Sequence, residues 1–208
     1  TCNGANLAYE RKAFYEVGGF KGIDDLASGD DELLLHKMAD RYGNRIGFLK
    51  NHDAIVYTQA KPTLREFIQQ RKRWASKSTR YKNKSIIVLG VLVWLFNLSI
   101  LLNLLVGLYM LLFSHAEADM NNMQMGFNTV GGEQSSSIPE PLLLLAFLQF
   151  LIKLLVEFCF LRKVTHFARR PELMQLLPLL NILHIVYIIY IGIAGNSGKY
   201  SWKGRMVK

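Results

Sequence analysis

Cysteine is scarce in this chain, and the two cysteines lie far apart in the sequence. Cys2 stands near the start, whereas Cys159 falls inside an apolar stretch beyond the first long apolar run. This placement excludes a disulfide framework, and no Cys/His spacing typical of a metal site is present. An initiator methionine and a signal-peptide pattern are also missing, so we expect a fragment of a longer protein.

Charged residues are sparse in the second part of the chain. Residues 85–208 contain nine Lys or Arg and six Asp or Glu, nearly all between long apolar runs, whereas residues 1–84 contain sixteen and ten. The 50% of hydrophobic residues and the mean hydropathy of +0.14 therefore average two unlike regions. We predict a soluble, basic domain over 1–84 and a transmembrane region over 85–208.

The apolar runs predict about three transmembrane helices. Residues 85–114 contain no charge, and as a helix they would reach about 45 Å, enough for one span of a hydrocarbon core of about 30 Å but not two. Lys153 and Glu157, within the second run, are four residues apart and so share a helix face. The simplest interpretation is a mutually neutralising pair that faces neighbouring helices. The expected spans are 88–112, 141–161 and 173–195.

The distribution of basic residues predicts the orientation in the membrane. Residues 115–140 contain four acids and no Lys or Arg, whereas Arg and Lys dominate the next connection, 162–170. The positive-inside bias then places residues 1–84 in the cytoplasm, in a multi-pass protein of the cell (inner) membrane. Three spans would leave the basic tail, 199–208, outside. The side of the C-terminus therefore stays open.

Seven bases precede the first apolar run. Such a cluster is typical of the cytoplasmic flank of a span, and it attracts anionic lipid heads. Nucleic-acid binding is the other interpretation of a basic cluster, but this one directly adjoins a membrane segment. We therefore expect membrane lipid as a partner and no nucleic acid. The seven bases are Arg71, Lys72, Arg73, Lys77, Arg80, Lys82 and Lys84.

Consecutive acids mark a predicted helix start in the soluble part. Asp30, Asp31 and Glu32 follow Gly29, and leucines at helical spacing come next. Acids in a first turn are stabilised by the helix dipole, which is the structural interpretation. A carboxylate held there beside a glycine turn can also act as a general base. Both interpretations are open at this point. Further along, Ala54–Tyr57 predicts a short strand.

A second candidate cluster lies on a helix that starts near Thr63. Gln70, Arg73 and Trp74 share one face of it. A guanidinium can bind a diphosphate, and an indole can stack on a sugar ring. The alternative is a juxtamembrane helix anchored by its tryptophan and by snorkelling bases. Near the chain start, Gly4 and Asn6 could contact a ligand or simply form a turn.

Taken together, four ordered motifs followed by membrane spans resemble the inverting family 2 glycosyltransferases, which include cellulose, chitin, hyaluronan and poly-N-acetylglucosamine synthases. Gln70, Arg73 and Trp74 match the family pattern Gln-x-x-Arg-Trp, and Asp30 aligns best with the aspartate of Thr-Glu-Asp. The tail Trp202-Lys-Gly-Arg205 resembles bacterial members. The motifs are Gly4-Ala5-Asn6, Val17-Gly-Gly-Phe20, Ser28-Gly-Asp-Asp31 and Gln70-Arg-Lys-Arg-Trp74.

The resemblance implies an α/β fold, namely the C-terminal part of a GT-A-like domain followed by the spans. It also implies transfer of a sugar from a nucleotide-sugar donor to a growing polysaccharide, with inversion. In this scheme Asp30, or else Asp31, is the base and Arg73 meets the diphosphate. Gln70 and Trp74 would shape the acceptor site, and Cys2, Gly4 and Asn6 would line the region nearby.

Mg²⁺ or Mn²⁺ is the cofactor that the resemblance implies, at an Asp-x-Asp site. No Asp-x-Asp occurs here, so we expect no metal ligands in this chain and no activity from the fragment alone. Two alternatives stay open: transfer of a single sugar to a lipid acceptor by the same fold, or a polytopic transporter or scaffold with a small soluble domain.

Overall fold

The computed structural model describes residues 2–24, 29–76, 84–124, 139–197, 200–202 and 205–207. These residues form two compact units. The first contains Thr1–Gly90 and Tyr190–Lys208, and the second contains Val91–Ile189. Four parts named above lie wholly or partly outside the described residues: Ser28, the bases between 77 and 83, the stretch 125–138 of the acidic connection, and positions 199, 203, 204 and 208 of the basic tail.

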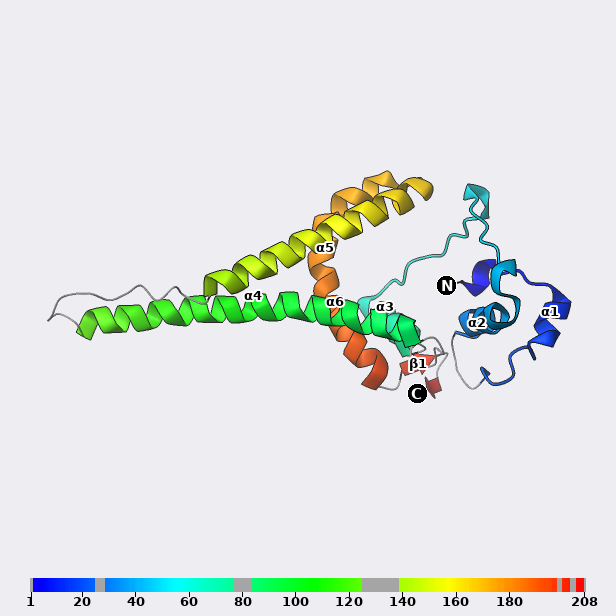
Figure 1. Ribbon diagram of the computed structural model, residues 1–208, viewed down its shortest axis with the longest axis horizontal. Coiled ribbons are helices and arrows are strands. Elements are labelled where there is room, and N and C mark those ends of the chain that lie inside the picture. Colours follow the sequence, from blue (N-terminus) through cyan, green and yellow to red (C-terminus); the bar gives the residue numbers. More distant parts are fainter. Residues whose placement is uncertain are drawn as a thin grey trace. The chain divides into compact units, whose positions relative to one another are not determined.

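The first unit is built from short helices and one small hairpin (Figure 1). Two helices, α4 and α6, are shared with the second unit. In chain order the elements are η1 (Gly4–Asn6), α1 (Arg11–Glu16), α2 (Asp30–Tyr42), η2 (Gly43–Arg45), η3 (His52–Ala54), α3 (Leu64–Ser76), the start of α4 (Lys84–Gln124), the end of α6 (Leu177–Ser197), β1 (Tyr200–Trp202) and β2 (Arg205–Val207).

The expected α/β fold is wrong for this chain, because the described residues are overwhelmingly helical. The predicted strand Ala54–Tyr57 does not form: Ala54 ends the 3₁₀ helix η3, and the next three residues have no regular structure. Val56 and Tyr57 are 52% and 75% exposed. A strand requires a neighbour for its backbone groups, and this segment has none among the residues described. The strands present are β1 and β2, which form a two-stranded antiparallel sheet.

Helix α2 supplies most of the buried apolar side chains that the structure describes in the first unit. It begins after Gly29, whose φ of 93° is readily adopted only by glycine, and ends at Tyr42 before Gly43. Leu33, Leu34 and Met38 are 6%, 1% and 8% exposed, and their spacing places them on one face. The periodicity of the apolar residues thus determines which face of α2 is buried.

The Val17-Gly-Gly-Phe20 motif forms a tight turn that packs against α1. Gly19 has a φ of 52°, and a Cβ there would lie 2.9 Å from Cζ of Phe14. Lys37 of α2 donates hydrogen bonds to the carbonyl oxygens of Gly19 (2.6 Å) and Lys21 (2.9 Å). The motif is therefore explained by close packing between the turn, α1 and α2.

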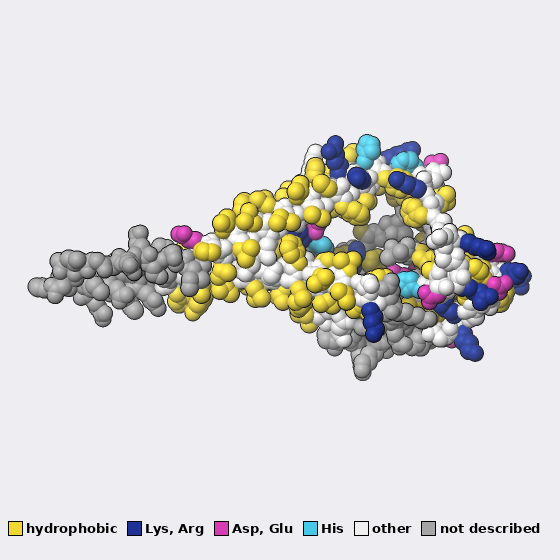
Figure 2. All heavy atoms as spheres, viewed as in Figure 1, with side chains coloured by type: hydrophobic (Ala, Val, Ile, Leu, Met, Phe, Trp, Pro, Cys, Tyr) yellow, Lys and Arg dark blue, Asp and Glu magenta, His cyan; other side chains and the backbone are white. Residues whose placement is uncertain are grey.

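Three helices are long and apolar enough to cross a membrane. They contain the three expected spans, and most of their leucine, valine and phenylalanine side chains face outward (Figure 2). Exposed apolar side chains at this density are typical of a membrane protein. The helices are Lys84–Phe113 within α4, Pro139–Phe167, which is α5, and Pro171–Asn196, which combines η5 (Pro171–Leu176) with α6.

Polar side chains connect α4 to α5 inside the second unit. Asn103 Nδ2 donates to Gln149 Oε1 at 3.0 Å, and Gln149 Nε2 donates to Ser99 Oγ at 3.1 Å. A Cβ at Gly107 would lie 2.8 Å from Cδ2 of Leu143, so the helices approach closely at that glycine. Small residues and interhelical hydrogen bonds are the usual means by which membrane helices associate.

A second polar group connects α5 to α6. The buried Lys153 ammonium pairs with the Glu157 carboxylate, as predicted, and Asn181 Nδ2 donates to Glu157 Oε2 at 2.7 Å. His184 Nδ1 lies 3.3 Å from Lys153 Nζ and 3.4 Å from Glu157 Oε1. The expected pair is thus part of a four-residue cluster that links two membrane helices.

Candidate functional site

The carboxylate of Asp31 is held by backbone N–H groups on both oxygens. Gly4 N–H donates to Oδ2 at 2.8 Å, and Glu32 N–H donates to Oδ1 at 2.8 Å. The Cys2 thiol donates to the Asp31 carbonyl oxygen at 3.3 Å. Two of the residues expected near the site, Cys2 and Gly4, therefore contact the first turn of α2 directly.

Asp30 differs from its neighbour. Its side chain is exposed, and it makes no hydrogen bond or ion pair with any residue in the described part of the chain. Gly29 turns the backbone immediately before it, and α2 begins at Asp30. The carboxylate thus sits at a helix N-terminus, with its side chain exposed.

The Gly4-Ala5-Asn6 motif is the short helix η1, and its polar groups are used in folding. Asn3 caps η1 by accepting a hydrogen bond from Ala5 N–H at 3.0 Å. The Asn6 amide donates to the Ala54 carbonyl oxygen at 2.6 Å, which ties η1 to η3. A Cβ on Gly4 would lie 3.6 Å from Asp31 Oδ2, an ordinary contact distance, so alanine would fit there.

Helix α3 carries the second candidate cluster and packs against the end of α6. Glu66 N–H donates to Thr63 Oγ1 at 3.2 Å, which confirms the predicted helix start. A Cβ at Gly195 would lie 2.4 Å from Cβ of Ala75, so the two helices touch at these small residues. Lys72 Nζ lies 6.0 Å from the centre of the Tyr190 ring.

Gln70 and Arg73 are half-buried on α3, and Trp74 is 37% exposed. The sequence interpretation named Arg71 only as a base and missed its stacking on two rings. Its guanidinium carbon lies 4.5 Å from the Trp74 ring centre and 4.8 Å from that of Phe67. Spacings of three and four residues on a helix predict such stacking and could have revealed it. Helix α3 contacts α6 and β1, and its placement beside Asp30 and Asp31 stays a prediction.

The perturbed titratable pair of the first unit lies away from these aspartates, at the other end of α2. The Tyr42 hydroxyl donates to Glu16 Oε2 at 2.6 Å. This hydrogen bond lowers the pKa of Glu16 below its usual value, and the charges of Arg41 and Lys12 lower it further. The same hydrogen bond raises the pKa of Tyr42, although Arg41 opposes that rise. Both groups are exposed, so the pair is a surface feature.

No group of three or more His, Cys, Asp or Glu within the described ranges is arranged to hold a metal ion. The groups that contact Asp31 are the Cys2 thiol and the backbone N–H groups of Gly4 and Glu32, and none of them is an oxygen ligand of the kind that Mg²⁺ requires. These residues therefore do not fit the expected cation, and no chemical step is assigned to a metal on this chain.

Comparison with known families assigns the chain. The family model described as glycosyl transferase family group 2 matches residues 1–191, which include both candidate clusters and nearly all of the three apolar helices. No curated protein and no solved structure matches significantly. The family implies a nucleotide-sugar donor and an acceptor, and the helices indicate a membrane protein. The match covers far more than half of the 208 residues, and the chain therefore belongs to glycosyl transferase family group 2.

Proposed function

We propose that this chain belongs to a membrane enzyme that transfers a sugar from a nucleotide-sugar donor to a growing polysaccharide, with inversion at the anomeric carbon. The catalytic part would face the cytoplasm, in the cell membrane. Asp30 is the general base. The observation that carries this proposal is a contrast between the two carboxylates. That of Asp30 is exposed and has no partner among the residues that the structure describes, whereas that of Asp31 accepts two hydrogen bonds.

The proposed reaction is a single displacement. The acceptor O–H transfers its proton to the Asp30 carboxylate while the oxygen attacks the anomeric carbon. The bond from that carbon to the donor diphosphate breaks, and the nucleoside diphosphate leaves with the electron pair. Asp30 then returns its proton to water. Attack from the face opposite the leaving group produces the inversion.

Arg73, Trp74 and Gln70 have the remaining proposed roles. The Arg73 guanidinium would stabilise charge that develops on the diphosphate, and the partly exposed Trp74 ring would contact the acceptor sugar. Gln70 would shape the acceptor site, with Cys2, Gly4 and Asn6 supporting the region around α2. The Mg²⁺ or Mn²⁺ of the family would bind outside this chain.

Substitution of each aspartate tests the base. In membranes that carry the complete gene product, Asp30→Asn should reduce sugar transfer by about 10²- to 10⁴-fold while donor binding changes little. Asp31→Asn keeps one oxygen acceptor for Gly4 N–H, so it should retain much of the activity. Full activity in Asp30→Asn together with loss in Asp31→Asn would move the role to Asp31.

A charge-matched pair tests the diphosphate contact. Arg73→Lys keeps the charge but loses the planar pair of donors, so activity should fall steeply. Lys72→Ala removes a charge beside Tyr190 and should change activity little. Turnover is measured per unit of membrane-inserted protein. Equal, small losses would remove Arg73 from the site and leave α3 as a membrane anchor.

The acceptor of the sugar could be a polysaccharide or a lipid, and a separate experiment distinguishes the two. Helix α3 contacts α6, the helix of the third candidate span, and this contact equally suits a lipid acceptor presented from the membrane. Radiolabelled donor distinguishes the two. Label that stays in high-molecular-mass polymer supports a polysaccharide, whereas label that is extracted into organic solvent after one transfer supports a lipid.

A further inference from the structure

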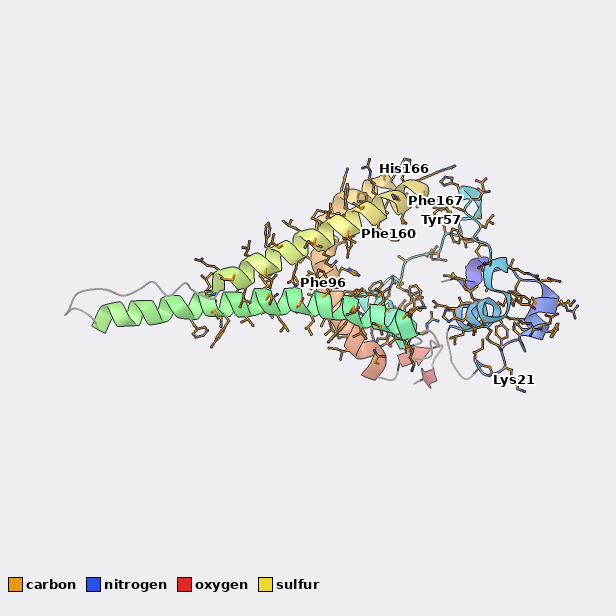
Figure 3. All side chains as sticks on the ribbon, viewed as in Figure 1. Lys21, Tyr57, Phe96, Phe160, His166 and Phe167 are labelled. Atoms are coloured by element: carbon orange, nitrogen blue, oxygen red, sulfur yellow. The ribbon has the colours of Figure 1, made fainter. Side chains whose placement is uncertain are left out.

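Five basic side chains gather where α5 ends. Arg162, Lys163 and His166 lie in the last turns of the helix, and Arg169 and Arg170 follow it; all five are exposed. Figure 2 shows dark blue and cyan side chains together over this end of α5, and His166 is labelled there in Figure 3. We call the segment 162–170 the basic turn.

The positive charge of the basic turn is only partly neutralised. Glu172 pairs with Arg170. In the part of the chain that the structure describes, Arg162, Lys163 and Arg169 make no ion pair with a carboxylate. Three cations are therefore available to an anion from outside the chain.

Arg169 has an unusual backbone. Its φ is 55°, the sole positive value among non-glycine residues of the described segments. Arg169 N–H donates to the His166 carbonyl oxygen (3.1 Å) and Arg170 N–H to that of Thr165 (2.8 Å). These two bonds close the helix C-terminus in the pattern for which glycine is the usual residue. A residue with a Cβ raises the free energy of this backbone conformation relative to glycine. The presence of arginine at this position therefore points to a role for its side chain.

The depth of the basic turn indicates which anion it meets. The 29 residues of α5 would span about 43 Å as a helix, more than a hydrocarbon core of about 30 Å. The apolar run ends at Leu161, and the next candidate span starts at Pro171. The basic turn therefore emerges among lipid headgroups, where the abundant anion is the phosphodiester.

We propose that the basic turn binds the phosphodiester headgroup of an anionic phospholipid, with Arg162, Lys163 and Arg169 as the cations. Guanidinium groups suit phosphate oxygens because their donors are planar and paired. The simpler account is that bases merely follow a span or stabilise the carbonyls at a helix end. In that account charge alone matters, and the strained Arg169 has no particular importance.

The test measures lipid binding to the whole 208-residue chain in detergent by native mass spectrometry. Phosphatidylglycerol is titrated against phosphatidylcholine, which carries no net charge. We expect tighter binding of phosphatidylglycerol, and we expect Arg169→Gly and Arg169→Asn each to weaken it about fivefold. Both residues tolerate the left-handed backbone, so the melting temperature should not fall. Arg169→Lys keeps the charge but loses the planar pair of donors, so it should also weaken binding, though less than the loss of the charge does.

Arg45→Gln is the matched control, because it removes one exposed charge from the first unit and should leave lipid affinity unchanged. If the Arg169 variants do not stay folded, Arg162→Gln/Lys163→Gln carries the test on regular helix and should also weaken phosphatidylglycerol binding. Equal affinity for the two lipids would overturn the proposal. So would wild-type affinity in Arg169→Gly, or an equal loss in Arg45→Gln.

Discussion

The ion pair inside the membrane-spanning helices differs in exposure from the ion pairs of the short helices in the first unit. In the unit Val91–Ile189 the Lys153 side chain is 4% exposed and pairs with Glu157. In the other unit Lys12 and Arg41 pair with Glu16 from side chains that are 79% and 55% exposed. Water can replace either partner of an exposed pair, whereas a charge left alone in an apolar surrounding has no substitute.

The same contrast extends to uncharged polar groups. Ser99, Asn103 and Gln149 hydrogen-bond to one another between α4 and α5. These polar side chains thus join two helices in the unit Val91–Ile189. In the first unit, the side chains of Asn3 and Asn6 bind backbone groups of short turns.

The largest expected effect tests the buried pair. Lys153→Met removes the cation beside Glu157 and should destabilise the chain by about 3–5 kcal/mol, because it leaves a partly buried carboxylate without its partner. The double variant Lys153→Met/Glu157→Leu should recover most of that stability. Unfolding in mixed micelles measures both. A single variant as stable as the wild type would show that the pair is hydrated and that the contrast between the units is smaller than described.

The second largest effect on stability is expected from a large side chain at Gly107. Gly107→Leu must displace Leu143, so we expect a loss of about 1–3 kcal/mol in the same unfolding assay. Gly90→Leu is the matched control, because it lies in the same helix and nothing lies within 4 Å of its added Cβ. Equal effects at the two glycines would mean that α4 and α5 do not depend on this close contact.

A smaller effect is expected from the interhelical hydrogen bonds. Gln149→Leu removes both bonds to α4 and should cost about 1 kcal/mol, the usual range for such bonds in membranes. A double-mutant cycle with Ser99→Ala measures the coupling directly. Strictly additive losses would contradict a hydrogen bond between these two side chains.

The smallest effect lies in the first unit and depends on pH. The lowered pKa of Glu16 means that its ionised form is favoured in the folded chain. Its contribution to stability is therefore present above the ordinary value of 4.5 and is lost as pH falls through the lowered folded value. Tyr42→Phe removes the first cause, so the pKa of Glu16, measured by NMR titration, should rise. An unchanged pKa would contradict the hydrogen bond.

Local patterns predicted several features correctly. The acid run predicted the start of α2 at Asp30, the Thr63/Glu66 spacing predicted the start of α3, and the spacing of Lys153 and Glu157 predicted their pairing. Each of these depends on residues within one helical turn. The strand expected at Ala54–Tyr57 failed because a strand depends on a distant neighbour.

The candidate site shows the same difference between features set by neighbouring residues and features set by distant ones. The sequence offered Asp30 as the first candidate for the base, through the resemblance of its motif, and Asp31 as the second. It could not settle the choice between them, because the difference is the hydrogen bond from Gly4, a residue 27 positions away. The stacking of Arg71 on Trp74 is local and could have been predicted from the spacing.

By itself the sequence determined the charge distribution, the three long apolar helices, the helix starts and the family. The charge distribution, the apolar helices and the helix starts follow from composition and from the short range of helical hydrogen bonds, whereas the family was indicated by the resemblance of the ordered motifs. Only the tertiary structure decided which aspartate stays free and that Asn181 and His184 join the Lys153–Glu157 pair. It also decided that α3 meets α6 at Ala75 and Gly195. The reason is that each of these contacts joins residues far apart in the chain, whose approach is determined by the packing of the helices that carry them.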